Sequence, residues 1–436
     1  MRILAIDGGY FSLDWYLRCL DDGHEVKVYC PDNPKTALIG KGLVERVSDW
    51  RDWIRWCDFC FLPDNVKWMA QLEPWKRAGV PIIGHTTDLA DWEIDRGVGM
   101  AMFKKHGVDI PPYKTFKNYP DAIAYVKKEN RPFASKPIGD CPDKNMSYVA
   151  KTPADLVFML EKWHKAGKRM EFILQELVTG VEMAVGGWIG PGGFSEGWCE
   201  NWEFKKMMPG DLGMQTGEMG TVLRVVKQSK LADKVLKPFE ETLVKMGACG
   251  YVDINCIIDD AGNPWPLEFT MRFGWPLYNI QQALIDGDHA EWLAALADGQ
   301  DLKPWKMDLT AAGVLMAIPD FPFSHISRKE VCGVPVYGLT PKLMENVHPC
   351  EMMLGTAPQD QDGKIVTSPC LVTAGDYVLV ASGTGGSVRQ ATTMAYRILK
   401  TLKVPNSPMY RTDIGARLKK QLPMIQSRGY ATGLEY

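Results

Sequence analysis

The sequence lacks several features that would place a protein in a class at once. No stretch of hydrophobic residues approaches the roughly 18 that a membrane-spanning helix needs, and the first hydrophobic run already ends at Asp7, too early for a signal peptide. No charge of one sign is in excess, because 50 Lys and Arg residues face 53 Asp and Glu residues, for a net charge of −3. Such a balance gives no overall attraction to nucleic acid or anionic membranes. We therefore expect a cytoplasmic protein without membrane or nucleic-acid partners.

The cysteines and glycines also do not form the motifs of a disulfide framework, a zinc site or a dinucleotide-binding site. The 436 residues contain 11 cysteines, an odd number without the dense spacing of a disulfide framework, so we expect reduced thiols. Cys57 and Cys60 form a lone Cys-x-x-Cys pair, and the second pair that a zinc site needs is missing. Gly8 and Gly9 follow the first predicted strand, but the third glycine of the dinucleotide-binding fingerprint is absent. These absences disfavour a zinc site and a Rossmann-type oxidoreductase.

The patterns that are present indicate three parts, in line with about 150 residues per domain. Residues 1–99 alternate short hydrophobic strands with helices, which predicts a doubly wound parallel α/β domain. Residues 100–325 mix helices with antiparallel strands, including a strand over 194–203 and a helix over 232–246. Residues 326–436 form a strand-rich C-terminal domain. The predicted fold class is therefore α/β and α+β.

Two carboxylates stand on adjacent predicted strands. Residues 250–258 and 264–269 are typical of strands joined by a tight turn, which brings Asp253 and Glu268 toward one spot. Two carboxylates with a neutral oxygen from a neighbouring Thr or Asn form the hard oxygen set that Mg²⁺ prefers. Arg272 lies further along the second strand and could neutralise a transferring phosphate. Taken alone, this pattern also fits a hairpin with solvent-facing acids.

A lysine, a loop and a linker precede this hairpin. Lys136 ends a predicted strand and is followed by a loop over 139–145 that could cover ATP phosphates, although it fails the P-loop pattern. A predicted strand over 172–177 leads into a linker that could sandwich an adenine, and Glu182 beyond it could hold ribose hydroxyls. Each feature alone also fits an ordinary strand end. Their order along the chain is distinctive.

In this order the segments resemble the ATP-grasp fold and, more closely, the phosphoribosylamine–glycine ligase (glycinamide ribonucleotide synthetase) family, nearly from end to end. The resemblance rests on Gln175-Glu-Leu-Val-Thr-Gly-Val-Glu182, Glu268-Phe-Thr-Met-Arg-Phe-Gly274 and segments 93–97, 103–111, 133–136, 204–206, 215–220 and 410–415. It implies an ATP-grasp domain over residues 100–325, with a small lid over about 112–180. It also implies a purine-biosynthesis ligase that joins glycine, or a similar amino acid, to phosphoribosylamine through an acyl phosphate and releases ADP.

The resemblance also implies roles for individual residues. The ATP-binding set comprises Arg96, Lys136, Lys144, Gln175, Glu176, Val178 and Glu182. The catalytic pair is Lys205 and Arg272, which balance the charge of the transferring phosphoryl group. The ligands for Mg²⁺ or Mn²⁺ are Asp253, Glu268 and Thr270. The family usually has lysine at the position of Arg96 and asparagine at that of Thr270, and we expect Asp253 to compensate for the weaker ligand.

The sequence departs from the family pattern on the side of the amine acceptor. Tyr10-Phe11-Ser12, Leu62-Pro63-Asp64, Gly217-Glu218 and Trp275-Pro276-Leu277 replace the Arg-Glu-His, Gly-Pro-Glu, Gly-Gly and Asp-Pro-Glu of the family. Three alternatives follow: the family's own reaction, the same chemistry on a different amine such as a modified nucleotide or metabolite, or a nucleotide-binding module without catalysis. We expect small-molecule substrates and a monomer or a small homo-oligomer.

Overall fold

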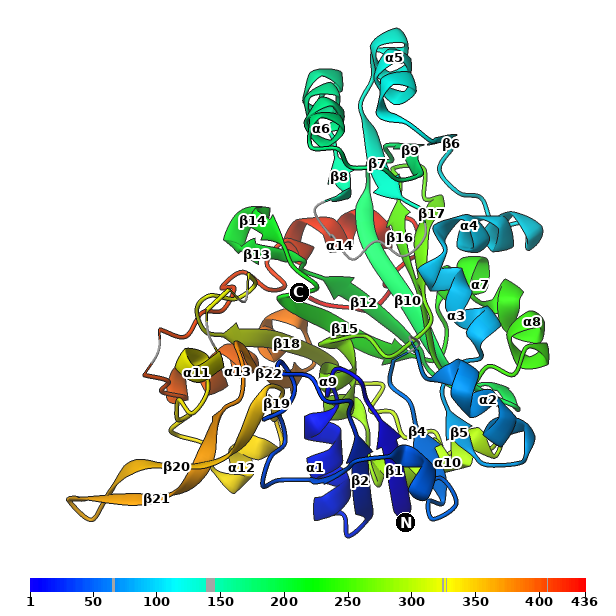
Figure 1. The fold of residues 1–436 in the computed structure, drawn as a ribbon. Coiled ribbons are helices and arrows are strands. Elements are labelled where there is room, and N and C mark those ends of the chain that lie inside the picture. Colours follow the sequence, from blue (N-terminus) through cyan, green and yellow to red (C-terminus); the bar gives the residue numbers. More distant parts are fainter. Residues whose placement is uncertain (65–66, 139–145, 324, 327, 406) are drawn as a thin grey trace.

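The computed structural model describes residues 1–64, 67–138, 146–323, 325–326, 328–405 and 407–436. Figure 1 shows the N-terminal sheet at the bottom, a central body that continues into the C-terminal segment, and a lid standing above the body. None of the helices formed by these residues has the length and hydrophobicity of a segment that crosses a bilayer.

The N-terminal part is a parallel sheet flanked by helices. Its strands run in the order β3-β2-β1-β4-β5, and every neighbouring pair is parallel. The strands are β1 (Arg2–Ile6), β2 (Glu25–Tyr29), β3 (Glu45–Val47), β4 (Phe59–Phe61) and β5 (Ile82–Ile83), and the helices are α1 (Leu13–Asp21), α2 (Met69–Arg77) and α3 (Thr87–Ile94). Residues 3–6 of β1 are all buried, as a strand covered on both faces requires. The predicted doubly wound parallel domain is confirmed.

The lid is an antiparallel sheet covered by two helices. Its strands, in the order β6-β9-β7-β8, are β6 (Tyr113–Phe116), β7 (Phe133–Pro137), β8 (Tyr148–Val149) and β9 (Phe172–Glu176). The helices α5 (Tyr119–Glu129) and α6 (Pro153–Lys165) begin at side-chain caps, since Asn118 accepts from the backbone of Asp121 and Thr152 from that of Asp155. The lid has its own hydrophobic core, which includes Leu160 and Phe172. It is therefore stabilised separately from the body.

One sheet runs through the body and into the C-terminal segment. Its order is β17-β16-β10-β12-β15-β18-β22-β19, with β11 paired to β10. The strands are β10 (Val181–Gly190), β11 (Gly193–Phe194), β12 (Trp198–Glu203), β15 (Gly220–Val226), β16 (Gly250–Ile258), β17 (Pro264–Thr270), β18 (Thr310–Ala317), β19 (Val347–Pro349) and β22 (Tyr377–Gly385). Two small ribbons, β13 (Lys206–Met208) with β14 (Leu212–Gln215) and β20 (Met352–Gln361) with β21 (Lys364–Thr373), lie outside this sheet. Figure 1 shows the β20–β21 hairpin projecting from the body.

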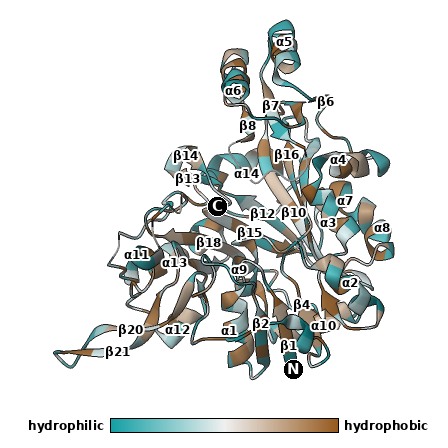
Figure 2. Cartoon of the chain, viewed as in Figure 1, coloured by the Kyte–Doolittle hydropathy of each residue, from teal (hydrophilic) through white to brown (hydrophobic). Residues whose placement is uncertain are grey.

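Helices pack around this sheet. They are α4 (Arg96–Lys105), α7 (Lys230–Val235), α8 (Glu240–Lys245), α9 (Leu277–Gln281), α10 (His289–Ala297), α11 (Arg328–Val331), α12 (Pro341–Met344), α13 (Val388–Thr401) and α14 (Leu418–Gln426). Figure 2 shows hydrophobic residues along the inner strands of the body. The largest buried cluster extends from β1 through β16 and β18 to α13. The N-terminal sheet, the body and the C-terminal segment therefore share one core.

Two predicted elements are interrupted in the structure. The helix expected over 232–246 is divided into α7, a 3₁₀ turn at Lys237–Phe239 and α8, because Pro238 has no backbone N–H to continue the helix. The strand expected over 194–203 is divided into β11 and β12 at Gly197, whose φ of 129° lies outside the range of an ordinary strand.

A buried polar contact joins the N-terminal part to the C-terminal segment. The ring of His348 in β19 lies 3.0 Å, through Nδ1, from Asp14 Oδ2 in α1 and 2.8 Å, through Nε2, from Ser382 Oγ in β22. All three side chains are buried. This contact holds the loop after β1 close to the C-terminal segment.

Candidate active site

The register of β16 and β17 places the predicted metal ligands on one face of the sheet. Asp253 pairs with Thr270, and Asn255 pairs with Glu268. Paired residues share a face, and so do residues two apart on one strand, so these four side chains face the same side. Glu182 on β10 lies on this face too, since Ala184 pairs with Asn255. Glu268 is thus directly opposite Asn255 and only diagonal to Asp253.

Arg96, Lys136 and Glu268 come together where the lid meets the body. Arg96 is the first residue of α4, whose start is fixed by the Asp95 carboxylate accepting from Gly97 N at 2.7 Å. Its Nη2 donates to Glu268 Oε2 at 3.2 Å. Desolvation would raise the pKa of Glu268, but the charges of Arg96, Lys205 and Lys136 outweigh it and lower that pKa to about 2. Glu268 is therefore ionised at neutral pH.

Lys136 projects from the lid strand β7 into this group of charges. Its Nζ donates to Gln175 Oε1 on β9 at 2.9 Å. Burial and the nearby charge of Arg96 lower the pKa of Lys136 to about 8. An anion beside Lys136 would restore the stability of its charged form, so this lysine is suited to bind a phosphate.

Lys205 is surrounded by carboxylates. Its Nζ lies 2.8 Å from Glu203 Oε2 and 3.7 Å from Glu182 Oε1, and Asn255 Nδ2 donates to the same Glu182 oxygen at 2.9 Å. Burial would lower the pKa of Lys205, but Glu203, Glu182 and Glu268 raise it well above its usual value. Lys205 is therefore a permanent positive charge at the site.

Asp253 lies deeper in the body than Glu268. Its Oδ2 accepts hydrogen bonds from Asn201 Nδ2 at 2.8 Å and from the Tyr251 hydroxyl at 3.1 Å. A Cβ atom on Gly186, opposite it on β10, would lie 2.8 Å from this oxygen, so glycine makes the space for the carboxyl group. Burial and the charge of Glu203 raise the pKa of Asp253 to about 7. A cation beside it would favour its ionised form.

Arg272 connects the body to the N-terminal part. Its Nε donates to Glu93 Oε1 in α3 at 3.0 Å, and its Nη1 donates to the Phe273 carbonyl at 3.0 Å. Glu93 also accepts from the Met271 backbone at 2.7 Å. The charge of Glu93 raises the pKa of Arg272 further. Arg272 is thus fixed beyond Thr270 by a neighbouring helix, as a positioned guanidinium should be.

The predicted adenine linker connects β9 of the lid to β10 of the body. Glu176 ends β9; its backbone N–H donates to the Pro112 carbonyl at 2.8 Å, and its Oε1 accepts from Arg131 Nη2 at 2.7 Å. Val178 is half-buried in the linker itself. Lys144, the other residue assigned to ATP, lies outside the described residues. The adenine assignment stays a prediction.

The donor groups of the site fit an anion with attached cations. Arg96 Nε and Nη1 and Gln175 Nε2 are buried without a hydrogen-bond partner, and Lys136 and Lys205 are close by. Such donors suit phosphate oxygens. Within the described parts of the chain, no three His, Cys, Asp or Glu side chains are grouped closely enough to hold a metal by themselves. The oxygens of Glu268, Asn255, Thr270 and Asp253 suit a Mg²⁺ that also binds phosphate and water, as this ion commonly does.

The sequence reasoning missed several charged or polar partners in this site. They are Glu93, which holds Arg272, Glu203, which holds Lys205, and Asn201, which binds Asp253. Asn201 and Glu203 alternate along β12, so they face the same side. Extending this alternation to Lys205 would have indicated Asn201 and Glu203 as neighbours of the site. Glu93 comes from a distant segment, and no local pattern indicates its contact with Arg272.

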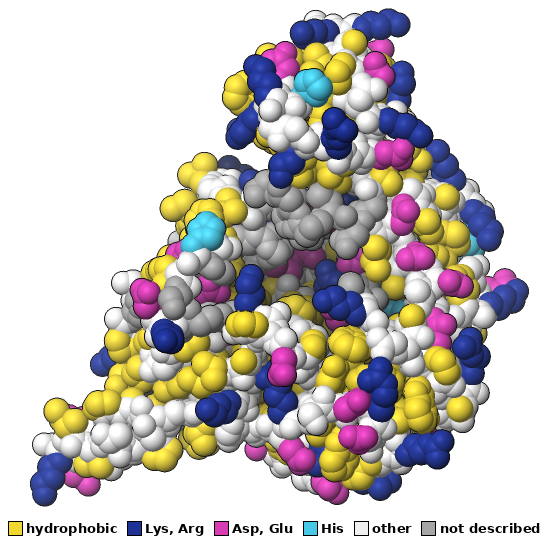
Figure 3. Space-filling view, viewed as in Figure 1, with side chains coloured by type: hydrophobic (Ala, Val, Ile, Leu, Met, Phe, Trp, Pro, Cys, Tyr) yellow, Lys and Arg dark blue, Asp and Glu magenta, His cyan; other side chains and the backbone are white. Residues whose placement is uncertain are grey.

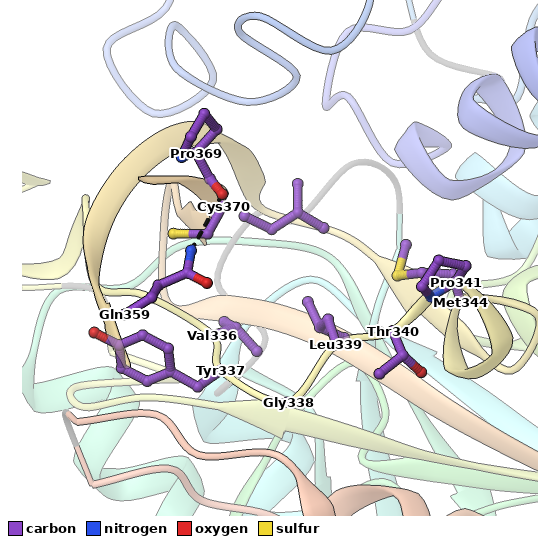
Figure 4. A pocket seen from close by; sticks show the side chains of 11 residues that line it. Val336, Tyr337, Gly338, Leu339, Thr340, Pro341, Met344, Gln359, Pro369 and Cys370 are labelled. Atoms are coloured by element: carbon purple, nitrogen blue, oxygen red, sulfur yellow. Dashed lines mark hydrogen bonds between the residues drawn. The ribbon is translucent and has the colours of Figure 1, made fainter. Parts of the chain in front are cut away.

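Two of the cavities outside this charged site bear on its function. One, lined by residues 336–341, 344, 359 and 369–371, lies at the base of the β20–β21 hairpin, where Gln359 Nε2 donates to the Pro369 carbonyl at 3.2 Å (Figure 4). Its lining residues, all of them described, include no charged side chain, so it lacks the groups that phosphoryl transfer needs. The other, here called the junction cavity, lies between the loop after β1, residues 217–218, the segment 275–279 and residues 321–322, 350–351 and 376–377. It contains about 380 Å³.

Figure 3 shows the molecule hollowed below the lid, with acidic and basic side chains in and around the hollow. Several lysines, arginines and carboxylates of the site belong to elements that meet between lid and body, β7, α4 and β17 among them. A site with fixed charges of both signs between two parts of the chain can position a polyanion and neutralise charge that develops on it.

Comparison with known proteins gives consistent matches. Residues 98–277 match the family model of the phosphoribosylglycinamide synthetase ATP-grasp (A) domain. The chain is 24% identical to a phosphoribosylamine–glycine ligase of Neisseria meningitidis serogroup B, over 95% of this chain and 98% of that protein. It is 25% identical to the phosphoribosylamine–glycine ligase of Streptococcus pneumoniae, over 96% of this chain and 100% of that protein.

Solved structures show the same fold. The phosphoribosylamine–glycine ligase of Thermotoga maritima matches with a TM-score of 0.71 at 18% identity, covering 95% of this chain and 100% of that one. An N5-carboxyaminoimidazole ribonucleotide synthetase in complex with ADP matches with a TM-score of 0.59 at 12% identity, covering 91% and 96% of the two chains. At these identities the structural likeness establishes the fold.

Proposed function

We propose that this chain, which belongs with the phosphoribosylamine–glycine ligases in the ATP-grasp superfamily, is an ATP-dependent ligase that joins a carboxylate to an amine. The resemblance inferred from its motifs is confirmed by these relatives. Their names specify glycine and phosphoribosylamine, which are the first substrates to test on this chain. ATP is the phosphoryl donor of the proposed reaction.

The observation that carries this proposal is the meeting of Arg96, Lys136 and Lys205 around Glu268, between the lid and the body. A module that only binds nucleotide needs cations for the phosphates but no ionised carboxylate among them. Glu268 is kept ionised here by three positive charges, so it would suit a hard divalent cation that neutralises phosphate charge. This arrangement favours catalysis over a nucleotide-binding module without turnover.

The proposed reaction balances without a nucleophilic side chain. A carboxylate oxygen of the amino acid attacks the γ-phosphorus, the bond from that phosphorus to the ADP oxygen breaks, and an acyl phosphate forms. The lone pair of the amine then attacks the acyl carbon, the C–O bond to phosphate breaks, and phosphate leaves with that electron pair while the amine loses its extra proton. The protein contributes orientation and charge balance. Lys136 and Lys205 would bind the phosphates, and Arg272 would face the transferring phosphoryl group.

Mg²⁺ or Mn²⁺, when bound, would supply further neutralisation of phosphate charge, and Glu268 with Asn255, Thr270 and Asp253 would hold it. The residues on this face offer only oxygen donors, which matches the preference of these hard ions. We also propose that the enzyme is a monomer or a small homo-oligomer that acts in the cytoplasm.

Trapping with hydroxylamine tests this function without knowledge of the natural amine. Hydroxylamine converts an acyl phosphate to a hydroxamate, which is measured by its iron(III) colour. With ATP, Mg²⁺ and glycine, we expect hydroxamate and ADP in equal amounts, and neither without glycine. Other amino acids replace glycine in parallel reactions. Binding of ATP without hydroxamate from any amino acid would contradict the ligase and indicate a nucleotide-binding module.

A further inference from the structure

The junction cavity is lined mainly by aromatic side chains and carboxyl groups. Phe11 and Trp275 stack with ring centroids 5.8 Å apart, and Tyr10 and Tyr377 complete the aromatic wall. Glu218 and Asn279 supply polar groups from the body. With about 380 Å³, the cavity is large enough for a small metabolite.

Four polar side chains that line this cavity, those of Tyr10, Glu218, Trp275 and Asn279, contain a buried atom without a hydrogen-bond partner among the described residues. Glu218 is 5% exposed, and its Oε1 has no hydrogen-bond partner. Asn279 is 1% exposed, and neither its Oδ1 nor its Nδ2 has a partner. Burying such groups unpaired costs on the order of 1–3 kcal/mol each. Polar atoms left in this state at a cavity wall are typical of groups that a ligand completes.

The surroundings of Glu218 decide the charge of that ligand. The charges that act on it are those of Glu203 and Asp253, which repel a second negative charge, and those of Lys205 and Arg272, which attract one. The carboxyl groups of Glu351 and Asp376 line the same cavity. Both cations are already engaged, Lys205 by Glu203 and Arg272 by Glu93. Burial and the charges of Glu203 and Asp253 raise the pKa of Glu218, which favours its protonated form until a cation lies beside it. A phosphate placed against Glu218 would add negative charge beside Glu203 and Asp253. A positive group would relieve the repulsion instead.

The aromatic wall favours the same charge. The face of a Trp, Tyr or Phe ring attracts an organic ammonium by about 0.5–2 kcal/mol when water is excluded. Phe11 and Trp275 stand on the same cavity as Glu218, so a ligand with an ammonium group and an apolar body would contact both. The neutral amide of Asn279 could bind a further N–H or C=O of such a ligand.

We propose that the junction cavity binds the acceptor of the ligase as a primary ammonium ion, held by Glu218 and the Phe11–Trp275 wall, rather than as a phosphosugar. This inference rests on the proposed ligase function. It specifies the acceptor class as an organic primary amine whose neighbouring body is apolar or flat. Lys205 and Arg272 lie on the Glu218 side of the cavity, so the bound amine would stand next to the phosphoryl-transfer groups.

Calorimetric titration with matched probes tests this binding in the wild-type chain with ATP analogue and Mg²⁺ present. The probes are 2-phenylethylamine, its neutral counterpart 2-phenylethanol, butylamine and ribose 5-phosphate. We expect each amine to bind at least tenfold more tightly than 2-phenylethanol and ribose 5-phosphate. Equal binding of the amine and the alcohol, tighter binding of ribose 5-phosphate, or no binding of either amine would overturn the proposal.

A variant then assigns the effect to one residue. Glu218→Gln keeps size and polarity but cannot form the carboxylate that an ammonium ion would stabilise, so we expect amine affinity to fall about tenfold while ATP affinity stays within twofold. Glu241→Gln, at an exposed glutamate of α8 paired only with Lys245 four residues on, serves as control. Unchanged amine affinity in Glu218→Gln would overturn the role of Glu218. The hydroxamate assay reports the ligase independently, so hydroxamate formation with failed amine binding would reject this inference alone.

Discussion

On the nucleotide side of this molecule each cation contacts a carboxylate or amide oxygen and the unpaired polar atoms of Arg96 and Gln175 are N–H donors, whereas the unpaired atoms of the junction cavity include a carboxyl oxygen. Arg96 binds Glu268, Lys205 binds Glu203 and Lys136 binds Gln175, all at hydrogen-bond distance. In the part of the junction cavity that the structure describes, Glu218 and Asn279 face aromatic rings instead. A site for a polyanion and metal needs positive and negative groups that hold each other in place before the ligand binds. A site for a small organic ion needs fewer polar groups and more apolar surface.

This contrast matches the way the sequence relates to its relatives. Segments that supply Lys136, Glu182 and Glu268 follow the pattern of the phosphoribosylamine–glycine ligases, whereas the departures include Phe11, Glu218 and Trp275 in the junction cavity. We infer that the phosphoryl-transfer half keeps the chemistry of the relatives, whereas the acceptor half is adapted to a different ligand. Each experiment below changes one half and leaves the other as control.

The largest effect is expected from Glu268→Gln. It removes the ionised carboxylate that Arg96, Lys205 and Lys136 surround, with little change in volume. We expect hydroxamate formation to fall about 10²- to 10³-fold, roughly 3–4 kcal/mol in the barrier. The variant should keep its fold, because the substitution removes a charge and no packed volume, but it should unfold at a lower temperature, since three cations lose the carboxylate that balances them. The control is Glu241→Gln, and near-normal ADP formation in Glu268→Gln at moderate Mg²⁺ would contradict the metal assignment.

A smaller effect concerns the acceptor half. We expect phosphoribosylamine, generated in the assay from ribose 5-phosphate and ammonia, to be used about 10- to 100-fold less efficiently than by the Streptococcus pneumoniae relative. The acceptor-side segments, such as Tyr10-Phe11-Ser12, depart from the family pattern. The loss of one charge-assisted phosphate contact there would cost about 1.5–3 kcal/mol. The measurement is kcat/KM for ADP release with glycine and ATP saturating. If both enzymes use phosphoribosylamine equally well, other residues supply the phosphate contact and the two halves are less different than proposed.

The sequence indicated the nucleotide half far better than the acceptor half, for physical reasons. Hydrophobic alternation predicts strands such as β16 and β17, and a tight turn between them fixes which residues can meet. The sequence could therefore predict that Asp253 and Glu268 lie on one face of the sheet, although their diagonal placement depends on the register, which the pattern does not give. Lys205–Glu203 and Arg272–Glu93 depend on side-chain direction and on contacts between distant segments. The junction cavity joins three parts of the chain, and no local periodicity carries that information.

The pH dependence of ATP affinity tests the role of Lys136 in the nucleotide half. The pKa of Lys136 is about 8, below that of an ordinary lysine, because of burial and the neighbouring Arg96. Phosphate binds the charged form, and this form is lost as the pH rises through 8. We therefore expect ATP affinity to fall by about tenfold per pH unit above pH 8, the limit for a single proton, whereas below pH 8 the titration of Asp253 near pH 7 also contributes.

Calorimetry with ATP and Mg²⁺ from pH 6.5 to 9.5 measures this dependence. Lys136→Arg should abolish the decline, since arginine keeps its charge throughout this range. Lys245→Arg, at an exposed lysine of α8, is the matched control and should leave the decline in place. A decline that persists in Lys136→Arg would show that a different group controls nucleotide affinity.

The smallest effect is expected at Thr270, the cross-strand partner of Asp253. Thr270→Val keeps the shape of the side chain and removes its only oxygen, whereas Thr270→Asn replaces the hydroxyl with a longer carbonyl that reaches further toward a shared metal. If Thr270 is a ligand, the Mg²⁺ concentration for half-maximal hydroxamate formation should rise about threefold in Thr270→Val, an effect of about 0.7 kcal/mol, within the usual range for one hydrogen-bonding group. It should fall in Thr270→Asn by a similar factor, because the amide oxygen is the stronger ligand for a hard cation. An unchanged Mg²⁺ requirement in both variants would remove Thr270 from the ligand set and leave Glu268, Asn255 and Asp253 to hold the metal.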